Sequence, residues 1–235
     1  MSSQVTYLSP FIHDIDEQKL VLGAVVAIGL LLIGSGAASR LRRRDGIENS
    51  IIPQPRFSVF ALFDFFIEKF LAFQDSILGR DNRRHLPFTA SLFLFIFCAN
   101  LIGLIPGLPA ITNSVGVNVG LAFVTFIYFN YQGTKAHGVL GYLKHFAGPV
   151  WWLAFIIFPV EILSTCLRIL TLNLRLYWNI SADHTVLHIM TGLVGPGAIP
   201  FYLMGTFVSL VQAFVFTTLT MIYILLATQH GEEEH

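Results

Sequence analysis

The segment from Trp151 to Met190, WWLAFIIFPVEILSTCLRILTLNLRLYWNISADHTVLHIM, decides the fold, because it is long, apolar and interrupted by only a few charged residues. After Lys144 the chain has no Lys or Arg except Arg168 and Arg175. A helix rises ~1.5 Å per residue, so about 40 residues reach about 60 Å, roughly twice the ~30 Å hydrocarbon core of a bilayer. The segment therefore predicts either one strongly tilted or bent helix, or two shorter pieces that are broken at Pro159.

Five polar side chains of this segment share one face at helical spacing. At about 100° per residue they fall within an arc of about 80°; they are Glu161, Ser164, Arg168, Thr171 and Arg175. Asn179 stays near this line, Asp183 lies about a quarter turn away, and His184 lies on the opposite side. Ionisable groups at membrane depth are costly and usually face protein or water, so the pattern favours an ion path. The alternative is a set of buried polar contacts between helices.

The composition is typical of an integral membrane protein. Of the 235 residues, 54% are hydrophobic and only 12% are charged, so residues 1–235 are expected to form a single membrane domain. The formal net charge of zero gives no electrostatic support for nucleic-acid binding. Cys98 and Cys166 both lie in apolar runs, which indicates membrane-buried thiols and not a disulfide pair or a metal site.

The apolar runs predict an all-α fold. Ordinary spanning helices are expected at residues 20–38, 86–106 and 115–131, and two long, strongly tilted helices at 149–190 and 198–229 are expected to form an antiparallel hairpin. Residues 57–79 predict an amphipathic helix in the membrane interface; the alternative is that this helix enters the bilayer more deeply or packs on a partner helix.

The distribution of basic residues predicts the topology. Nearly all of them lie in the loops at 40–56, 80–84 and 135–144, whereas the loops at 107–114 and 191–199 contain none. Because basic residues accumulate in cytoplasmic loops, five crossings are expected, with the N-terminus outside and the C-terminus in the cytoplasm.

Four elements of the sequence together resemble subunit a of the F-type ATP synthase. They are Leu172-Asn-Leu-Arg175-Leu-Tyr-Trp-Asn179, Glu161-Ile-Leu-Ser164, Asn100-Leu-Ile-Gly-Leu-Ile-Pro106 and Leu210-Val-Gln212-Ala-Phe-Val-Phe216. The resemblance covers nearly the whole chain. It implies a non-catalytic stator subunit in a bacterial inner membrane, which passes protons through two offset half-channels. The implied partners are a ring of c subunits, b-type peripheral stalk subunits, the rest of the complex and membrane lipid.

The resemblance also implies roles for individual residues, without any cofactor or metal. Arg175 corresponds to the essential arginine between the half-channels. The outer half-channel would be bordered by Asn179, Asp183, His184, Gly205 and Gln212, and the cytoplasmic one by Glu161, Ser164, Arg168 and Thr171. For Arg168 the alternative is that it only extends its charge to the lipid head groups.

The chain departs from the family at one place. Members commonly carry a carboxylate and an imidazole, one nine residues after the arginine and the other seven before the glutamine, where this chain has His184 and Gly205. The carboxylate has moved to Asp183. If Arg175 lies opposite Gln212 in the helical hairpin, Gly205 faces Asp183, and we expect a gap at this glycine that holds water between Asp183 and His184.

Three other interpretations remain. A sodium-coupled version of the same motor is possible in principle, although Asp183 and His184 favour protons because both residue types titrate readily. A stand-alone transporter would need discontinuous helices in two corresponding halves, which are absent. A cytochrome-type carrier would need histidine pairs on two helices, and only His184 and His188 form a pair. No phosphate-binding Gly-rich loop with a lysine occurs, so nucleotide chemistry would belong to partner subunits.

Overall fold

The computed structural model describes residues 14–43, 59–105, 108–147, 154–195 and 199–229. These residues are almost entirely helical and contain no strand, which confirms the all-α expectation. The helices are α1 (Ile15–Arg43), α2 (Val59–Leu78), α3 (Leu86–Gly103), α4 (Val115–Ala147), α5 (Ala154–Val194) and α6 (Ile199–Gln229), with the short 3₁₀ turns η2 (Arg80–His85) and η3 (Ile111–Asn113).

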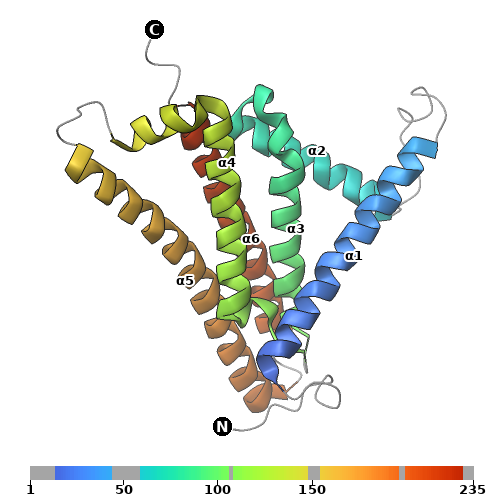
Figure 1. Cartoon of the computed structure of the whole chain (residues 1–235). Helices are drawn as coiled ribbons and strands as arrows, with labels where there is room; N and C mark the ends of the chain where they lie inside the picture. Colours follow the sequence, from blue (N-terminus) through green and yellow to red (C-terminus); the bar gives the residue numbers. More distant parts are fainter. Residues whose placement is uncertain (1–13, 44–58, 106–107, 148–153, 196–198, 230–235) are drawn as a thin grey trace.

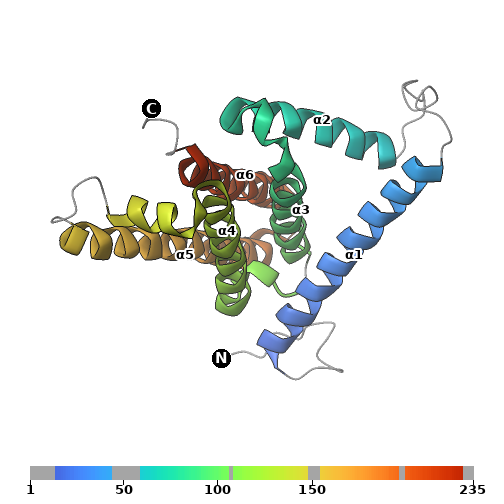
Figure 2. The same cartoon turned by 45° about the horizontal axis from the view of Figure 1, so that its top comes forward.

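The helices α3, α4 and α6 form the centre of the structure (Figure 1). α5 packs on α4 and leans away from the centre on one side, and α1 leans away on the other, while α2 lies across one end of the bundle (Figures 1 and 2). Two segments of the described chain are long and apolar enough to cross a membrane by length and composition, Arg80–Gly103 and Ile199–Thr228. The number of five crossings therefore stays a prediction.

The long apolar segment that contains Pro159 and Arg175 forms one helix, α5, from Ala154 onward. α5 runs for 41 residues and includes Pro159, so the interpretation as two pieces is wrong. Pro159 lies near the beginning of the helix, where its missing N–H removes a single backbone hydrogen bond and the helix continues.

α4 is longer than the sequence predicted. The expected helix ended at residue 131, but α4 continues through Lys135 to Gly138 and, after a kink there, to Ala147. Gly138 has φ 71° and ψ 162°, a conformation that a residue without Cβ adopts at little cost. Figure 1 shows the last part of α4, in yellow-green, turning aside from the axis of its first part.

The main hydrophobic core joins α2, α3, α4 and α6. Ile96 of α3 and Ala213, Phe216, Met221 and Ile224 of α6 are at most 1% exposed. Aromatic pairs attach α2 to this core: the ring centroids of Phe73 and Phe214 are 4.7 Å apart, and those of Phe66 and Phe93 are 5.4 Å apart. These contacts hold one side of α6 against α2, α3 and α4. The candidate residues Gly205 and Gln212 lie on this helix.

A set of buried polar contacts joins α2, η2, α3 and α4. Thr89 Oγ1 donates to Gln74 Oε1 at 2.6 Å, and both side chains have no exposed area. The buried His85 accepts a hydrogen bond from Arg84 at Nε2, so its Nδ1 donates to the Tyr128 hydroxyl at 2.9 Å. These direct contacts provide hydrogen-bond partners for polar groups whose burial without a partner would cost free energy.

An ion pair lies beside these contacts. Arg83 Nε donates to Asp75 Oδ1 at 3.0 Å and Arg83 Nη2 donates to Asp75 Oδ2 at 2.5 Å, which holds the pKa of Asp75 below its ordinary value. The two-point contact of a planar guanidinium fixes the orientation of η2 against α2.

Tyr128→Phe tests the buried contact to His85. The ring keeps its stack on Phe88, with 3.7 Å between centroids, but the imidazole loses its hydrogen-bond acceptor. The loss of about 1–2 kcal/mol of stability should lower the thermal unfolding midpoint of the detergent-solubilised protein by about 2–8 °C. Tyr131→Phe is the control, because Tyr131 is 60% exposed and should change nothing. Equal midpoints for the two variants would contradict the role of this contact.

Candidate functional site

Arg175 lies on an exposed apolar face of α5. Leu163, Leu167, Leu170 and Leu174 on this helix are between 45% and 61% exposed, and Trp178 is 64% exposed. The Arg175 side chain is exposed as well, and it makes no hydrogen bond or ion pair with another described residue. A permanent charge on an otherwise apolar surface is a group that a partner's carboxylate would satisfy.

One turn beyond Arg175, α5 is linked to α6. Asn179 Nδ2 donates to Gln212 Oε1 at 3.0 Å, and Gln212 is only 4% exposed. Gln212 was expected opposite Arg175, so the contact between the two helices is displaced by one helical turn from that expectation. Two residues predicted for the same path, Asn179 and Gln212, are thus in direct contact.

His184 lies beside the end of α3, and its neighbour Asp183 has a buried carboxylate oxygen. A Cβ added at Gly103, the last residue of α3, would lie 2.9 Å from His184 Nε2, and the same Cβ would lie 2.9 Å from the Cβ of Ala110. The imidazole therefore fills the space that the missing side chain leaves. Asp183 Oδ2 is buried and has no hydrogen-bond partner among the described residues. A buried carboxylate oxygen of this kind requires a partner such as water.

The expected gap at Gly205 does not exist. Gly205 is buried, and a Cβ at this position would lie 2.7 Å from Leu104 Cδ2. The Leu104 side chain already occupies the space beside the glycine, so this space is apolar and filled. Gly205 therefore does not supply the water-filled link between Asp183 and His184 that the sequence analysis predicted. The side chain that fills the space comes from the end of α3, which the pairing of α5 with α6 alone did not take into account.

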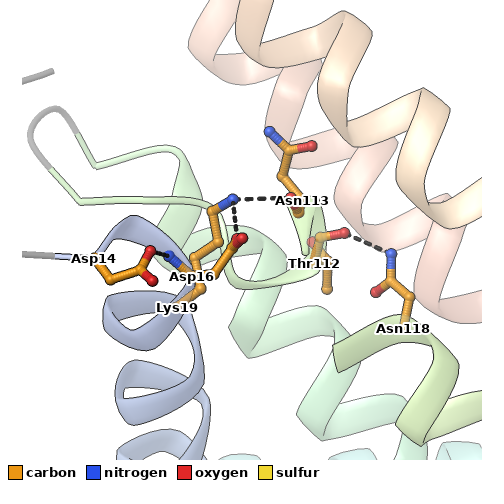
Figure 3. A network of polar contacts seen from close by, with 6 residues as sticks. All are labelled: Asp14, Asp16, Lys19, Thr112, Asn113 and Asn118. Atoms are coloured by element: carbon orange, nitrogen blue, oxygen red, sulfur yellow. Dashed lines mark hydrogen bonds and ion pairs between the residues drawn. The ribbon is translucent and has the colours of Figure 1, made fainter. Parts of the chain in front are cut away.

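Buried amides gather where α3 ends and α4 begins. Thr112 of η3 donates through Oγ1 to Asn100 Oδ1 at 2.7 Å. Figure 3 shows the second contact, in which Asn118 Nδ2 donates to the Thr112 carbonyl at 2.7 Å. Asn100, Thr112 and Asn118 are each 1% exposed. Asn100 Nδ2, Asn113 Oδ1 and Asn118 Oδ1 remain buried without a hydrogen-bond partner in the described part of the chain.

These atoms identify a polar region that sequence reasoning missed. Asn100 was noted only as part of a family element, while Thr112, Asn113 and Asn118 had no assigned role. The available signal was the presence of three amides close to an uncharged loop between two apolar runs. We call Asn100, Thr112, Asn113 and Asn118 the amide cluster. Ordered water is the usual partner for buried amide atoms of this kind.

The other group of predicted residues lies toward the beginning of α5. Ser164 and Thr171 border an open hollow of about 480 Å³ together with Pro159, Val160, Leu163 and Leu167. Its walls are mainly aliphatic, so the two hydroxyl groups are its polar points. Glu161 and Arg168 belong to the same helical face by their spacing, but their side chains lie outside the described residues.

The described side chains include no group of three His, Cys, Asp or Glu residues that could hold a metal ion. The His188 side chain lies outside the description. Cys98 is a free thiol, and the side chain of Cys166 is not described.

Comparison with known proteins adds an independent line of evidence. The sequence model of the family described as ATP synthase A chain matches residues 21–225. The chain is 41% identical over 199 residues to ATP synthase subunit a of Bdellovibrio bacteriovorus, covering 84% of this chain and 86% of that protein. It is 38% identical over 219 residues to subunit a of Helicobacter hepaticus, with 90% and 89% covered. For subunit a of Sorangium cellulosum the identity is 34% over 225 residues, with 94% and 87% covered.

Gly103→Ala tests the position of His184. The new Cβ would overlap the imidazole and Ala110, and overpacking of this kind costs about 1–3 kcal/mol of stability. Gly120→Ala on α4 is the matched control, because no atom lies within 4 Å of its added Cβ; it should stabilise the helix by about 0.5–1 kcal/mol. Thermal unfolding midpoints of the two variants should therefore move in opposite directions. A stabilised Gly103→Ala variant would show that the imidazole does not occupy this space.

Proposed function

Because the chain belongs to the ATP synthase A chain family, whose members are membrane-sector subunits of ATP synthase, we propose that it is the stator beside which a ring of c subunits rotates. In this role the chain conducts protons to and from the ring and carries out no chemistry on nucleotides. A stator must be held against the rotating ring, so the proposed partners also include b-type peripheral stalk subunits and the rest of the complex.

The exposed position of Arg175 is the observation that carries this proposal. A guanidinium stays charged under all working conditions, so it attracts a carboxylate of the ring and keeps that carboxylate ionised while it passes. The same fixed charge repels a proton that would move directly from one half-channel to the other. The exposed leucines on the same side of α5 offer an apolar surface for the helices of the ring.

The outer half-channel is proposed to run from the amide cluster to Gln212. Asp183 and His184 follow Asn179 on α5, and His184 lies beside Gly103 and Ala110, close in the chain to the cluster. The unpaired atoms of the cluster and of Asp183 would hold a chain of waters. Protons move readily along such a chain when each water has fixed polar neighbours. Gly205 is proposed here as a packing position beside this path and not as part of its lining.

The cytoplasmic half-channel is proposed to follow the hollow beside Ser164 and Thr171. Glu161 and Arg168 extend the same polar face of α5 by their sequence spacing. Once a ring of helices covers the hollow, its two hydroxyl groups would border a narrow polar passage that leads toward Arg175. The two half-channels then reach Arg175 from opposite ends of the helix.

The distribution of basic residues supports an orientation in a bacterial inner membrane. The basic loops at 40–56, 80–84 and 135–144 would face the cytoplasm, with the N-terminus outside and the C-terminus inside. α2, which lies across the end of the bundle, is then proposed to rest in the cytoplasmic interface. Protons are the proposed coupling ions, and a sodium-dependent variant of the motor is the alternative that ion replacement would test.

Arg175→Ala is expected to abolish coupled proton transport, because the passing carboxylate loses its charged partner and the barrier between the half-channels disappears. Arg175→Lys should fail as well, since a compact ammonium does not reproduce the planar guanidinium. The measurement is ATP-driven proton pumping by the reconstituted complex, normalised to the amount of assembled complex. Arg80→Ala is the control, because Arg80 is an exposed arginine away from α5. Pumping near the wild-type rate by Arg175→Ala would disprove the assignment.

A cysteine pair tests the division into two half-channels. In a chain whose Cys98 and Cys166 are replaced by serine, Ser164→Cys should react with a charged thiol reagent from the cytoplasmic side, and Asn179→Cys from the outer side. The reason is that each position borders a different aqueous path. Labelling rates in sealed vesicles of each orientation measure this directly. Equal rates for both cysteines from one side would contradict the two-path arrangement.

A further inference from the structure

One face of α1 is turned toward η3. Lys19 Nζ donates to the Asn113 carbonyl at 3.1 Å and lies 3.2 Å from Asp16 Oδ1 (Figure 3). The Lys19 side chain is only 14% exposed, whereas that of Asp16 is 77% exposed. The ammonium group is thus largely withdrawn from water, and the carbonyl of η3 is its acceptor on the protein side.

The next turn of α1 makes an apolar contact with the same segment. Ile111 of η3 is fully buried, and a Cβ added at Gly23 would lie 3.2 Å from Ile111 Cγ2. Val26 and Ala99 complete this second hydrophobic cluster. Lys19 and Gly23 are four residues apart and share one helical face, so α1 holds η3 at two points, one charged and one apolar.

The segment held in this way carries the amide cluster. The Asn113 carbonyl accepts from Lys19, while the Asn113 Oδ1 atom is buried without a described partner. In Figure 3 the Asn113 side chain points away from the cluster of Asp14, Asp16 and Lys19. Thr112, its neighbour in η3, contacts both Asn100 and Asn118. A change in the orientation of this turn would therefore displace Thr112 and Asn113 and break the contacts of Thr112 with Asn100 and Asn118.

We propose that Lys19 is a positioning residue for proton entry from the outer side, and that α1 is part of the outer half-channel through its hold on η3. This inference rests on the proposed function of the amide cluster. The groups around Lys19 explain why the ammonium acts on η3. Asp16 lies on α1 and Asp14 directly precedes this helix, whereas η3 supplies the Asn113 carbonyl as an acceptor. The side chains of η3 and α4 that Figure 3 shows beside this contact, Thr112, Asn113 and Asn118, are uncharged. The Asp16 carboxylate is 77% exposed, so water screens its ion pair with Lys19 and the pair contributes little.

The position of η3 has a specific kinetic consequence. If Lys19 is lost, only a fraction of the molecules hold η3 in the position that allows proton entry. The apparent affinity of the outer path for protons is then the intrinsic affinity multiplied by that fraction. The maximal rate at saturating outer proton concentration changes less. A purely structural defect gives the opposite pattern, because fewer assembled complexes lower the maximal rate and leave the half-saturating concentration unchanged.

The test is ATP synthesis by the reconstituted holoenzyme, driven by an imposed proton gradient at several pH values on the outer side. Lys19→Met should raise the half-saturating proton concentration by about tenfold, which corresponds to the loss of one charge-assisted hydrogen bond. Lys19→Arg, which keeps donors and charge, should restore most of the affinity. Asp16→Asn is the matched control and should change it less than about twofold.

Each outcome decides the question. An unchanged half-saturating concentration in Lys19→Met, or a shift of equal size in Asp16→Asn, overturns the inference. If Lys19→Met does not assemble, Lys19→Gln, whose side chain is neutral and one bond too short to reach the Asn113 carbonyl in the same way, takes its place, and a normal proton dependence there has the same meaning. The Arg175→Ala variant separates the two levels, because surviving transport in that variant would refute the proposed function, whereas a null result at Lys19 beside an inactive Arg175→Ala refutes only the role of α1.

Discussion

Polar groups in an apolar environment need partners, and this requirement organises the structure. An unpaired buried amide or hydroxyl costs about 1–3 kcal/mol, and a charge costs more. Near η2 the requirement is met within the chain, since Gln74 pairs with Thr89 and His85 with Tyr128. Near η3 it is met only in part, because the amide cluster keeps three buried atoms without a described partner. The same kinds of polar side chain thus pair with one another at one end of α3 and leave buried atoms that need water as a partner at the other end.

The sequence predicted the helices because each apolar run is long and bounded by prolines, glycines or charges. It failed at α4, where Lys135 looked like the beginning of a loop although lysine is compatible with a helix and only Gly138 interrupts the backbone geometry. The polar face of α5 could also be predicted from the sequence, since helical spacing determines which residues share a face. Spacing does not say which neighbour that face meets, so the amide cluster, which depends on contacts between α3, η3 and α4, could not be predicted.

The glycines illustrate the same limit. In the sequence Gly205 looked like a missing side chain and hence a gap, but protein interiors are close-packed, and a neighbour normally fills such a space. Leu104 fills it beside Gly205, and His184 fills the corresponding space beside Gly103. A glycine between packed helices therefore marks the place where another side chain enters. Which side chain enters depends on the register of the helices. The Asn179–Gln212 contact shows that the register of α5 and α6 differs by one turn from the expected pairing of Arg175 with Gln212.

The packing of α5 shows that Arg175 lies at the boundary between two differently packed parts of this helix. Every described side chain that precedes Arg175 on this helix is exposed or half-buried, whereas the buried ones, Ile180 and Leu187, both follow it. The later part of α5 is therefore fixed against the bundle, and the earlier part offers an apolar surface to a partner. Arg175 lies where the one changes into the other. A polar path enclosed within the chain must end near this boundary, and a path that needs a partner to enclose it must begin there. In the proposed function, a permanent cation at that point would separate the two half-channels without any moving part of its own.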